Sequence, residues 1–331
     1  MNRKNGFVSP LVLGVAAVLF LVAVVVTAVV LKTSDKIVGL DYECNYSHNS
    51  SFISSIAAAL GNRAAEFNNG ICLMEKKEYG EAYKVFVSAA EKGLADAQCE
   101  LGYMHAEGLG VTQDLEKSEH WYRMAANQGN GSALVSLGLM YYDGTVVPKN
   151  RLEAAKLWIR ALNKYPRTWR TDVEFLLGDM YLNGDGVEQN YDEALRYLTR
   201  SANAGNAVAQ NNLAYMYAVG KGVEQNHQKA VEWGMKSAMQ GNAESQCSLG
   251  GAYERGEGVE QDYYMAVEWY KKSAMQGYAP AQNALGIAYE LGKGVEQDYN
   301  KAMEWYQKAA VQGFQPAQEN LERFYEAPSA D

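Results

Sequence analysis

The sequence has few of the residues from which catalytic and metal sites are built. Its 331 residues include only four histidines and four cysteines, and neither set shows the spacing of metal ligands or of a reactive thiol pair. Motifs typical of serine hydrolases, zinc proteases and phosphate-binding loops are also absent. We therefore expect a protein that is not an enzyme and that binds no metal or cofactor.

Basic residues are scarce as well. The chain carries 30 lysines and arginines against 39 aspartates and glutamates, which gives a formal net charge of −9. Proteins that bind nucleic acid neutralise its phosphates with clustered basic side chains. This acidic chain lacks a basic stripe, so nucleic acid is not expected among its partners.

Charge is missing altogether from a segment near the N-terminus. Residues 7–31 contain no charged side chain and are dominated by valine, leucine and alanine. The segment exceeds the roughly 20 residues that cross a bilayer, and it is longer than the apolar core of about 7–15 residues in a signal peptide. It predicts one transmembrane helix over 7–31, after a short segment at 1–6. Cleavage near Ala28, or after Gly6 as in type IV prepilins, remains an alternative.

The orientation of this helix follows from a small excess of positive charge. Arg3, Lys4 and the α-amino group precede the span, whereas Lys32 and Lys36 follow it. Cytoplasmic flanks carry more lysine and arginine. In a bacterium we therefore expect a single-pass protein of the inner (cytoplasmic) membrane, with a cytoplasmic N-terminus. A polar, serine-rich tether over 32–60 would join it to a periplasmic body.

The four cysteines have different expected roles. Cys99 and Cys247 occupy equivalent positions in a sequence repeat of 36 residues and lie four units apart. They therefore cannot bond each other within one array. We expect both to be small buried residues. Cys44 and Cys72 could form a bridge in an oxidising compartment.

What the sequence does contain is a repeat with a period of 36 residues. The string GVEQN begins at Gly186 and Gly222, and GVEQD begins at Gly258 and Gly294. Degenerate copies extend the register towards the N-terminus. A period between about 20 and 50 residues is typical of stacked helical arrays, so the chain is expected to be a repeat scaffold.

One unit shows how each repeat folds. From Ala279 onwards, apolar residues recur at spacings of three and four, which indicates a helix. Gly292 is expected to end it, and Asp298 is placed to cap the second helix by accepting a hydrogen bond from a free N–H. Aspartate or asparagine occupies this capping position in six units. We expect two antiparallel helices in each unit. The capping residues are Asp114, Asn150, Asn190, Asn226, Asp262 and Asp298.

Small and aromatic residues also recur in register. One small column lies in the first helices, at Gly102, Gly138, Gly178, Ala214, Gly250 and Gly286. A glycine inside a helix costs up to about 1 kcal/mol relative to alanine, so this column predicts a close approach between helices. A tryptophan column in the second helices is expected to lie in the core. Its members are Trp121, Trp233, Trp269 and Trp305.

Taken together, these columns resemble the Sel-one-like repeat family, which is related to the tetratricopeptide repeats. The resemblance covers roughly residues 95–326 and implies an all-α, right-handed α-solenoid of antiparallel helix pairs. We expect a tetratricopeptide-like pair over 61–93, six Sel-one-like repeats over 94–314, and a capping helix with a tail over 315–331. That makes seven helix pairs and one capping helix. Some cysteine-rich members resemble penicillin-binding enzymes in activity, but this chain lacks their cysteine pairs.

In such arrays the first helices line a concave groove, where side chains off the packing stripe face a partner. One column directly after the small residue varies while its neighbours do not, which suits recognition, although half-buried spacers would vary too. Its candidate binding residues are Tyr103, Leu139, Asp179, Tyr215 and Ile287, with Gly251 in the same register.

A second candidate is a break in the period between Leu162 and Thr171, where the spacing stretches from 36 to 40 residues. The inserted segment is basic and aromatic in an acidic chain, and Trp and Arg are enriched at binding hot spots. Its candidate residues are Arg167, Trp169 and Arg170. Trp169 could instead fill a widened joint between units.

These observations favour a membrane-anchored scaffold or adaptor that presents a helical groove to one or more protein partners in the bacterial envelope. Within that class, the family resemblance also implies a periplasmic immunity protein that occludes a secreted lipase-type toxin. A second version of the scaffold is an adaptor in envelope signalling or polysaccharide export. An envelope-remodelling enzyme is the remaining alternative.

Overall fold

The structure is a computed structural model that describes residues 63–164 and 170–326. Within these two ranges every regular element is an α-helix and no strand occurs. The predicted transmembrane helix over 7–31 and the tether over 32–60 lie outside the described residues. In the part that is described, no helix combines the length and the apolar character needed to cross a membrane.

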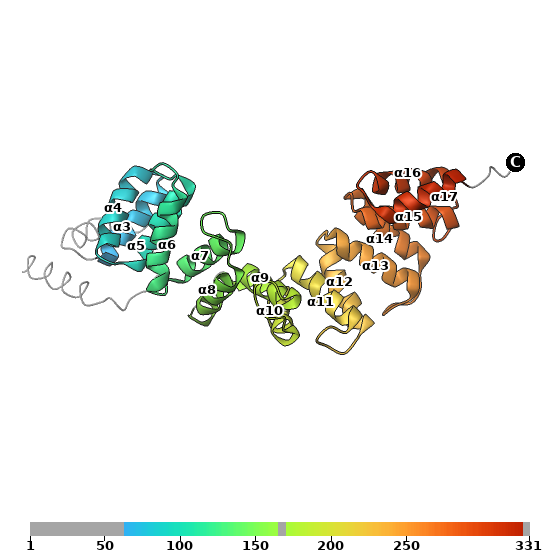
Figure 1. Ribbon diagram of the computed structural model, residues 1–331, viewed down its shortest axis with the longest axis horizontal. Helices are drawn as coiled ribbons and strands as arrows, with labels where there is room; N and C mark the ends of the chain where they lie inside the picture. Colours follow the sequence, from blue (N-terminus) through green and yellow to red (C-terminus); the bar gives the residue numbers. More distant parts are fainter. Residues whose placement is uncertain (1–62, 165–169, 327–331) are drawn as a thin grey trace, which may run out of the picture. The chain divides into compact units, whose positions relative to one another are not determined.

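The chain divides into two compact units, Met1–Tyr165 and Pro166–Asp331, which are described separately (Figure 1). The division falls at the segment where the period of the sequence stretches. Three helix pairs are described in the first unit. Its helices are α3 (Arg63–Glu75), α4 (Tyr79–Glu91), α5 (Ala95–Glu107), α6 (Leu115–Asn127), α7 (Gly131–Asp143) and α8 (Arg151–Lys164).

The second unit contains four helix pairs and one further helix. Within the described ranges the two units together hold 15 helices, which confirms the predicted seven pairs and capping helix. The helices of the second unit are α9 (Arg170–Asn183), α10 (Tyr191–Asn203), α11 (Ala207–Val219), α12 (His227–Met239), α13 (Ala243–Arg255), α14 (Tyr263–Met275), α15 (Ala279–Leu291), α16 (Tyr299–Ala310) and α17 (Gln315–Glu326).

The loop inside each pair explains why the GVEQ string recurs. Gly292 ends α15 with φ 65°, a left-handed conformation that glycine adopts without strain. Gln297 then donates from Nε2 to the carbonyl of Glu290, at 2.7 Å, and so satisfies one free carbonyl of that helix. The same bond recurs in four other loops, from Gln113, Gln189, Gln225 and Gln261.

The predicted capping residues all perform that role. In each of the six units the aspartate or asparagine side chain accepts a hydrogen bond from a backbone N–H in the first turn of the second helix; the bond from Lys301 N–H to Asp298 Oδ1 is 3.0 Å long. A second, unpredicted set of caps begins the first helices. These are Asn130, Asn206 and Asn242.

Neighbouring pairs are joined by buried glutamines. Gln246 on α13 donates to the carbonyl of Ala238 on α12 at 3.0 Å and accepts from Gln276, at the end of α14, at 2.8 Å. Because buried polar groups without partners are costly, these bonds fix the register between pairs. Gln98, Gln210 and Gln282 make the same two bonds.

Inside each pair, one large side chain of the second helix lies over the small residue of the first helix. A Cβ added to Gly286 would lie 2.6 Å from the ring of Tyr306, which is fully buried. The predicted close approach between helices is therefore confirmed, and its cause is this ring. We call these side chains the ring column, although one is a leucine. They are Phe86, Tyr122, Trp158, Leu198, Tyr270 and Tyr306.

The tryptophan column differs from the prediction. Trp269 is buried, but Trp121, Trp233 and Trp305 are only half-buried, so the expectation that the whole column is core was wrong. The three half-buried rings pack against core clusters without being enclosed by them. A lysine one turn later lies over three rings of the column, the buried Trp269 among them, and this arrangement is stabilised by cation–π attraction. The lysines are Lys236, Lys272 and Lys308, at 3.9–4.0 Å from the ring centroids.

The last helix, α17, closes the second unit. Ala317 is fully buried, and Phe324 packs against the rings of Tyr299 and Tyr306. Glu322 stands where the first helices carry their small residue, and it is exposed because no second helix covers it. This agrees with the predicted capping role, since a terminal repeat needs a polar outer face.

Candidate binding cleft

The predicted recognition column turns out to be only partly exposed. Tyr103 and Leu139 in the first unit, and Tyr215 in the second, are 44%, 40% and 46% exposed. Asp179 is half-buried and accepts hydrogen bonds from Asn183 and Asn212. Ile287 is half-buried as well, because it packs against the cluster around α16 and α17. Asp179 and Ile287 thus contribute to packing within the second unit.

The inserted segment cannot be placed. Arg167 and Trp169 lie outside the described residues, and although Arg170 begins α9, its side chain lies outside them too. A partner contact through the basic and aromatic side chains of this segment therefore remains a prediction. The segment does mark the division between the two units.

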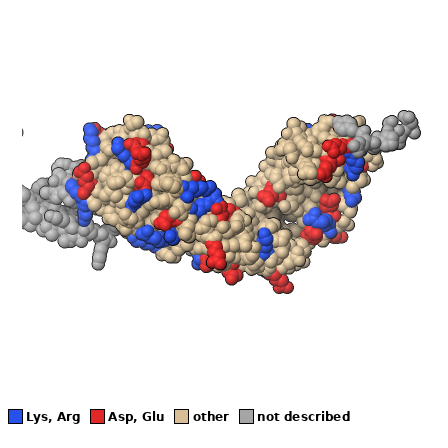
Figure 2. Space-filling view, viewed as in Figure 1, with Lys and Arg blue, Asp and Glu red and all other residues tan. Residues whose placement is uncertain are grey.

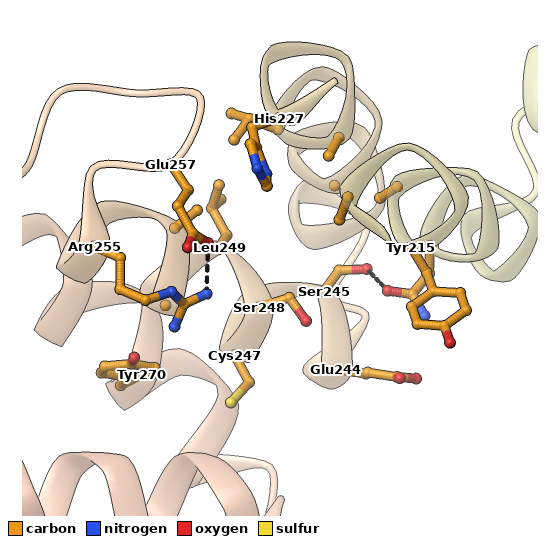
Figure 3. A pocket seen from close by; sticks show the side chains of 18 of the residues that line it. Tyr215, His227, Glu244, Ser245, Cys247, Ser248, Leu249, Arg255, Glu257 and Tyr270 are labelled. Carbon is orange, nitrogen blue, oxygen red and sulfur yellow. Dashed lines mark hydrogen bonds and ion pairs between the residues drawn. The ribbon is translucent and has the colours of Figure 1, made fainter. Parts of the chain in front are cut away.

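Tyr215 borders a cleft in the second unit. The cleft has a volume of about 400 Å³ and is enclosed by α11, α12 and α13, with contributions from α14 and α15. Figure 3 shows His227 on α12, Tyr215 on α11, and Ser248 with Cys247 on α13 around its interior. Two members of the recognition column, Tyr215 and Gly251, line this cleft.

The cleft exists because the ring column is interrupted. Gly234 on α12 occupies the place that Tyr270 and Tyr306 occupy in the next two pairs, so no side chain fills the space. Ala214, which faces it, replaces the usual glycine of the first helix, and a Cβ on Gly234 would lie 3.7 Å from its methyl group. A methyl group fills only a small part of the volume of a ring. Both residues line the cleft.

Exposure of the neighbouring small residues supports this origin. The column Ala82, Ala154, Ala194, Ala266 and Ala302 is buried in the other pairs, whereas Ala230 on α12 is half-exposed. Likewise, the glycines that correspond to Ala214 in the other Sel-one-like units are buried, whereas Ala214 is not. We call the contact between the two helices of one pair its joint. The missing ring therefore opens the joint between α11 and α12 to solvent.

The rim of the cleft is charged. Arg255 Nη2 lies 2.9 Å from Glu257 Oε2, and this ion pair is drawn as a dashed line in Figure 3. The hydrogen bond lowers the pKa of Glu257 and raises that of Arg255. Glu244 also borders the cleft, so an incoming group meets both signs of charge.

The interior of the cleft is suited to binding and not to nucleophilic chemistry. Burial, and then the nearby charge of Glu244, raise the pKa of the Cys247 thiol to about 11, which leaves very little reactive thiolate at neutral pH. Ser245 donates to Asn211 and is thereby fixed. Among the residues that the structure describes, no group of three or more His, Cys, Asp or Glu could hold a metal ion.

The other cysteines can be placed in part. Cys99 and Cys247 are free thiols; Cys99 is buried as expected, and Cys247 is only half-buried because it lies in the cleft. Cys72 is disulfide-bonded. The predicted partner, Cys44, lies outside the described residues, so that pairing remains a prediction.

Charges of both signs are interspersed over the face of the molecule shown in Figure 2, without a continuous basic stripe. On this face the surface does not have the single-sign character of a site that tracks a phosphate backbone. A protein partner fits such a surface better.

Two comparisons with solved structures support the fold. The chain is similar to a protective antigen of uropathogenic Escherichia coli with an SLR fold (35% identity, TM-score 0.72), covering 83% of this chain and 59% of the antigen. It is also similar to a Sel1 repeat protein from Oxalobacter formigenes (31% identity, TM-score 0.60), covering 74% of this chain and 96% of that one.

Curated relatives match over shorter stretches. The exopolysaccharide production negative regulator of Rhizobium meliloti is 29% identical over 158 residues, which are 44% of this chain and 58% of the relative. Chitin synthase regulatory factor 3 of Schizosaccharomyces pombe is 31% identical over 134 residues, 40% of this chain and 14% of the relative. The chain thus spans less than two thirds of the length of these relatives.

The model of the Sel1 repeat matches the chain six times, and together these copies cover more than half of it. The matches span residues 95–130, 131–164, 171–206, 207–242, 243–278 and 279–314. They coincide with the helix pairs from α5–α6 to α15–α16. The chain therefore belongs to the Sel1 repeat family, whose repeats are protein-interaction modules.

Proposed function

We propose that this protein is a membrane-anchored adaptor that binds a protein partner through the cleft between α11, α12 and α13. The observation that carries the proposal is the cleft itself, which is open to solvent and bordered by the exposed ring of Tyr215. Concave sites with apolar walls and a few polar groups are where proteins bind ligands. Exposed aromatic side chains at such sites are typical of interface hot spots.

The anchor is part of the same proposal. Residues 7–31 are long and apolar enough in sequence to span a bilayer, and the charges that precede them favour a body in the periplasm. The disulfide at Cys72 supports an oxidising compartment. An adaptor held at the membrane in this way would meet partners in the cell envelope.

The relatives favour a regulatory role over a catalytic one. Two of them, from Rhizobium meliloti and Rhizobium leguminosarum, carry the name exopolysaccharide production negative regulator. This supports an adaptor in polysaccharide export or envelope signalling. A partner that proved to be a secreted toxin would instead assign the immunity role.

The experiment is site-specific crosslinking in cells. A photoreactive amino acid replaces Tyr215 in the full chain, and a matched chain carries it at Tyr264, which is 63% exposed and does not line the cleft. We expect one discrete adduct from position 215, found in the membrane fraction, and none from position 264. Equal labelling at both positions, or none at 215, would refute binding at the cleft.

A further inference from the structure

The interruption of the ring column indicates what the cleft binds. We propose that the cleft at Gly234 receives the side chain of a single tyrosine from the partner protein, which thereby supplies the ring that this repeat lacks. The inference rests on the proposed function and specifies the chemistry of its partner.

The neighbouring pairs show the shape of the side chain that is missing. In the α13–α14 pair, Tyr270 lies so close to Gly250 that an added Cβ would be 2.6 Å from its ring, and Tyr306 and Gly286 repeat this distance in α15–α16. The α11–α12 pair has the same helix lengths as α13–α14, a polar capping residue at the same position and the same loop glutamine. Its missing ring therefore leaves a space of nearly the same form, reduced by the methyl group of Ala214 and open at one side.

The other pairs also show what the hydroxyl group of such a ring meets. Where the first helix carries a glutamate near its end, the tyrosine hydroxyl donates to it, as Tyr306 does to Glu290 at 2.6 Å. The α5–α6 pair has Ala106 at that position. There burial raises the pKa of the Tyr122 hydroxyl, and the side chain of Ser136 on the following helix acts against that rise.

The α11–α12 pair has the second arrangement. Ala218 stands at the position of Ala106, and Ser248 stands at the position of Ser136. Both line the cleft, and Figure 3 shows Ser248 in its interior. A ring that entered from outside would thus meet a serine at the same position as the one that acts on Tyr122, and a hydroxyl group there favours tyrosine over phenylalanine.

Short peptides test the proposal directly. The purified full chain in detergent is titrated with acetyl-Ala-Ala-Tyr-Ala-Ala-amide and with the Phe and Ala versions, and binding is followed by saturation-transfer NMR and by slower alkylation of Cys247. We expect the Tyr peptide to bind, the Phe peptide to bind about two- to ten-fold more weakly because one hydrogen bond is lost, and the Ala peptide not to bind.

Two variants decide whether the cleft is responsible. The double substitution Ala214→Gly with Gly234→Tyr copies the neighbouring pairs and fills the space, so it should abolish binding while the helix content and urea midpoint are kept. Ser248→Ala should remove the preference for Tyr over Phe and leave Phe binding unchanged, without disturbing the fold. Met239→Ser changes an exposed residue outside the cleft. It should alter neither the binding of the Tyr peptide nor the preference for Tyr over Phe.

Several outcomes would overturn the inference. Undiminished Tyr binding by the filled variant, or equal binding of the Tyr and Ala peptides, would exclude a tyrosine site. Self-association of the wild-type chain that the filled variant abolishes, seen by sedimentation, would make a second copy the occupant and refute a separate partner. If the peptides fail while crosslinks from position 215 persist, only this inference falls; if those crosslinks are absent, the proposed function falls.

Discussion

The α11–α12 pair and the α15–α16 pair are built alike, and their largest difference lies where the two helices of each pair meet. Both end the first helix with a left-handed glycine, cap the second helix with a polar side chain and fix the loop with a glutamine. In α15–α16 the joint is filled by Tyr306, which is fully buried, whereas α12 has Gly234 there. A solenoid can therefore form a cleft by omitting one side chain without changing its backbone.

Buried glutamines explain why the open joint of α11–α12 does not collapse. These glutamines bond the α11–α12 pair to the pairs on both sides of it. Gln210 joins α11 to α10, and Gln246 joins α13 to α12. The backbone cannot close over the gap without breaking these bonds. In a repeat array, contacts with both neighbouring pairs can therefore stabilise a pair that contains a cavity.

The largest effect should come from opening the closed joint. Tyr306→Ala removes a fully buried ring and its hydrogen bond to Glu290, and large-to-small changes of this kind cost about 3–5 kcal/mol. We expect the free energy of unfolding in urea to fall by that amount. The matched control is Tyr264→Ala, which removes a ring that is 63% exposed and should change stability by no more than about 0.5 kcal/mol.

Equal losses for the two variants would contradict the comparison. That outcome would mean that the ring column does not carry the packing between the helices, and Gly234 would then not account for the cleft. A loss of unfolding free energy for Tyr306→Ala alone would support the comparison. It would show that α15–α16 depends on a ring at the joint, whereas α11–α12 folds without one.

A smaller effect is expected from closing the open joint. Gly234→Tyr alone would press a ring against the Ala214 methyl, and Ala214→Gly alone costs about 1 kcal/mol in a helix. Together they copy the neighbouring pairs, so the double variant should be more stable than the wild type by about 1–2 kcal/mol. Urea unfolding of the four chains gives a coupling energy, which we expect at about 0.5–3 kcal/mol. Additive effects would show that the two positions do not form one joint.

Much of the fold could be predicted from the sequence because its signals are local. The period, the capping residue Asp298 and the stop at Gly292 depend on neighbours within a few residues, and each was confirmed. The close approach at Gly286 was also predicted, although the partner ring was not named. Identifying that ring requires the register between two helices, which spacing alone does not provide.

The cleft was missed for the same reason. Gly234 reads as one more small residue inside a helix, and its meaning appears only when Trp233-Gly234 is aligned with Trp269-Tyr270. The sequence did single out Tyr215, which borders the cleft, but the same column included Asp179 and Ile287, which are bonded or packed within the second unit. The exposure of each residue depends on the side chains of the neighbouring repeat. The variability of one column therefore could not distinguish the exposed Tyr215 from the half-buried Asp179 and Ile287.

The smallest effect concerns pH and again contrasts the two pairs. Asp298 caps α16 and its pKa is lowered, first by the backbone hydrogen bond from Lys301, whereas the equivalent cap of α12 is the neutral Asn226. A lowered pKa in the folded state means that the carboxylate stabilises the fold above its ordinary pKa of 3.8, and that this contribution is lost as the pH falls through the lower folded value.

This contrast predicts a difference between two exchanges. Asp298→Asn should weaken the dependence of the urea midpoint on pH between pH 5 and pH 3, because it removes one group whose protonation destabilises the helix end. Asn226→Asp should strengthen that dependence by a similar amount, since the new carboxylate would meet the same free N–H groups. A change in pH dependence from one exchange and none from the other would show that the two caps are not equivalent in environment. The equivalence of the α11–α12 and α15–α16 backbones would then fail at the cap, and with it the premise that Gly234 alone separates the two joints.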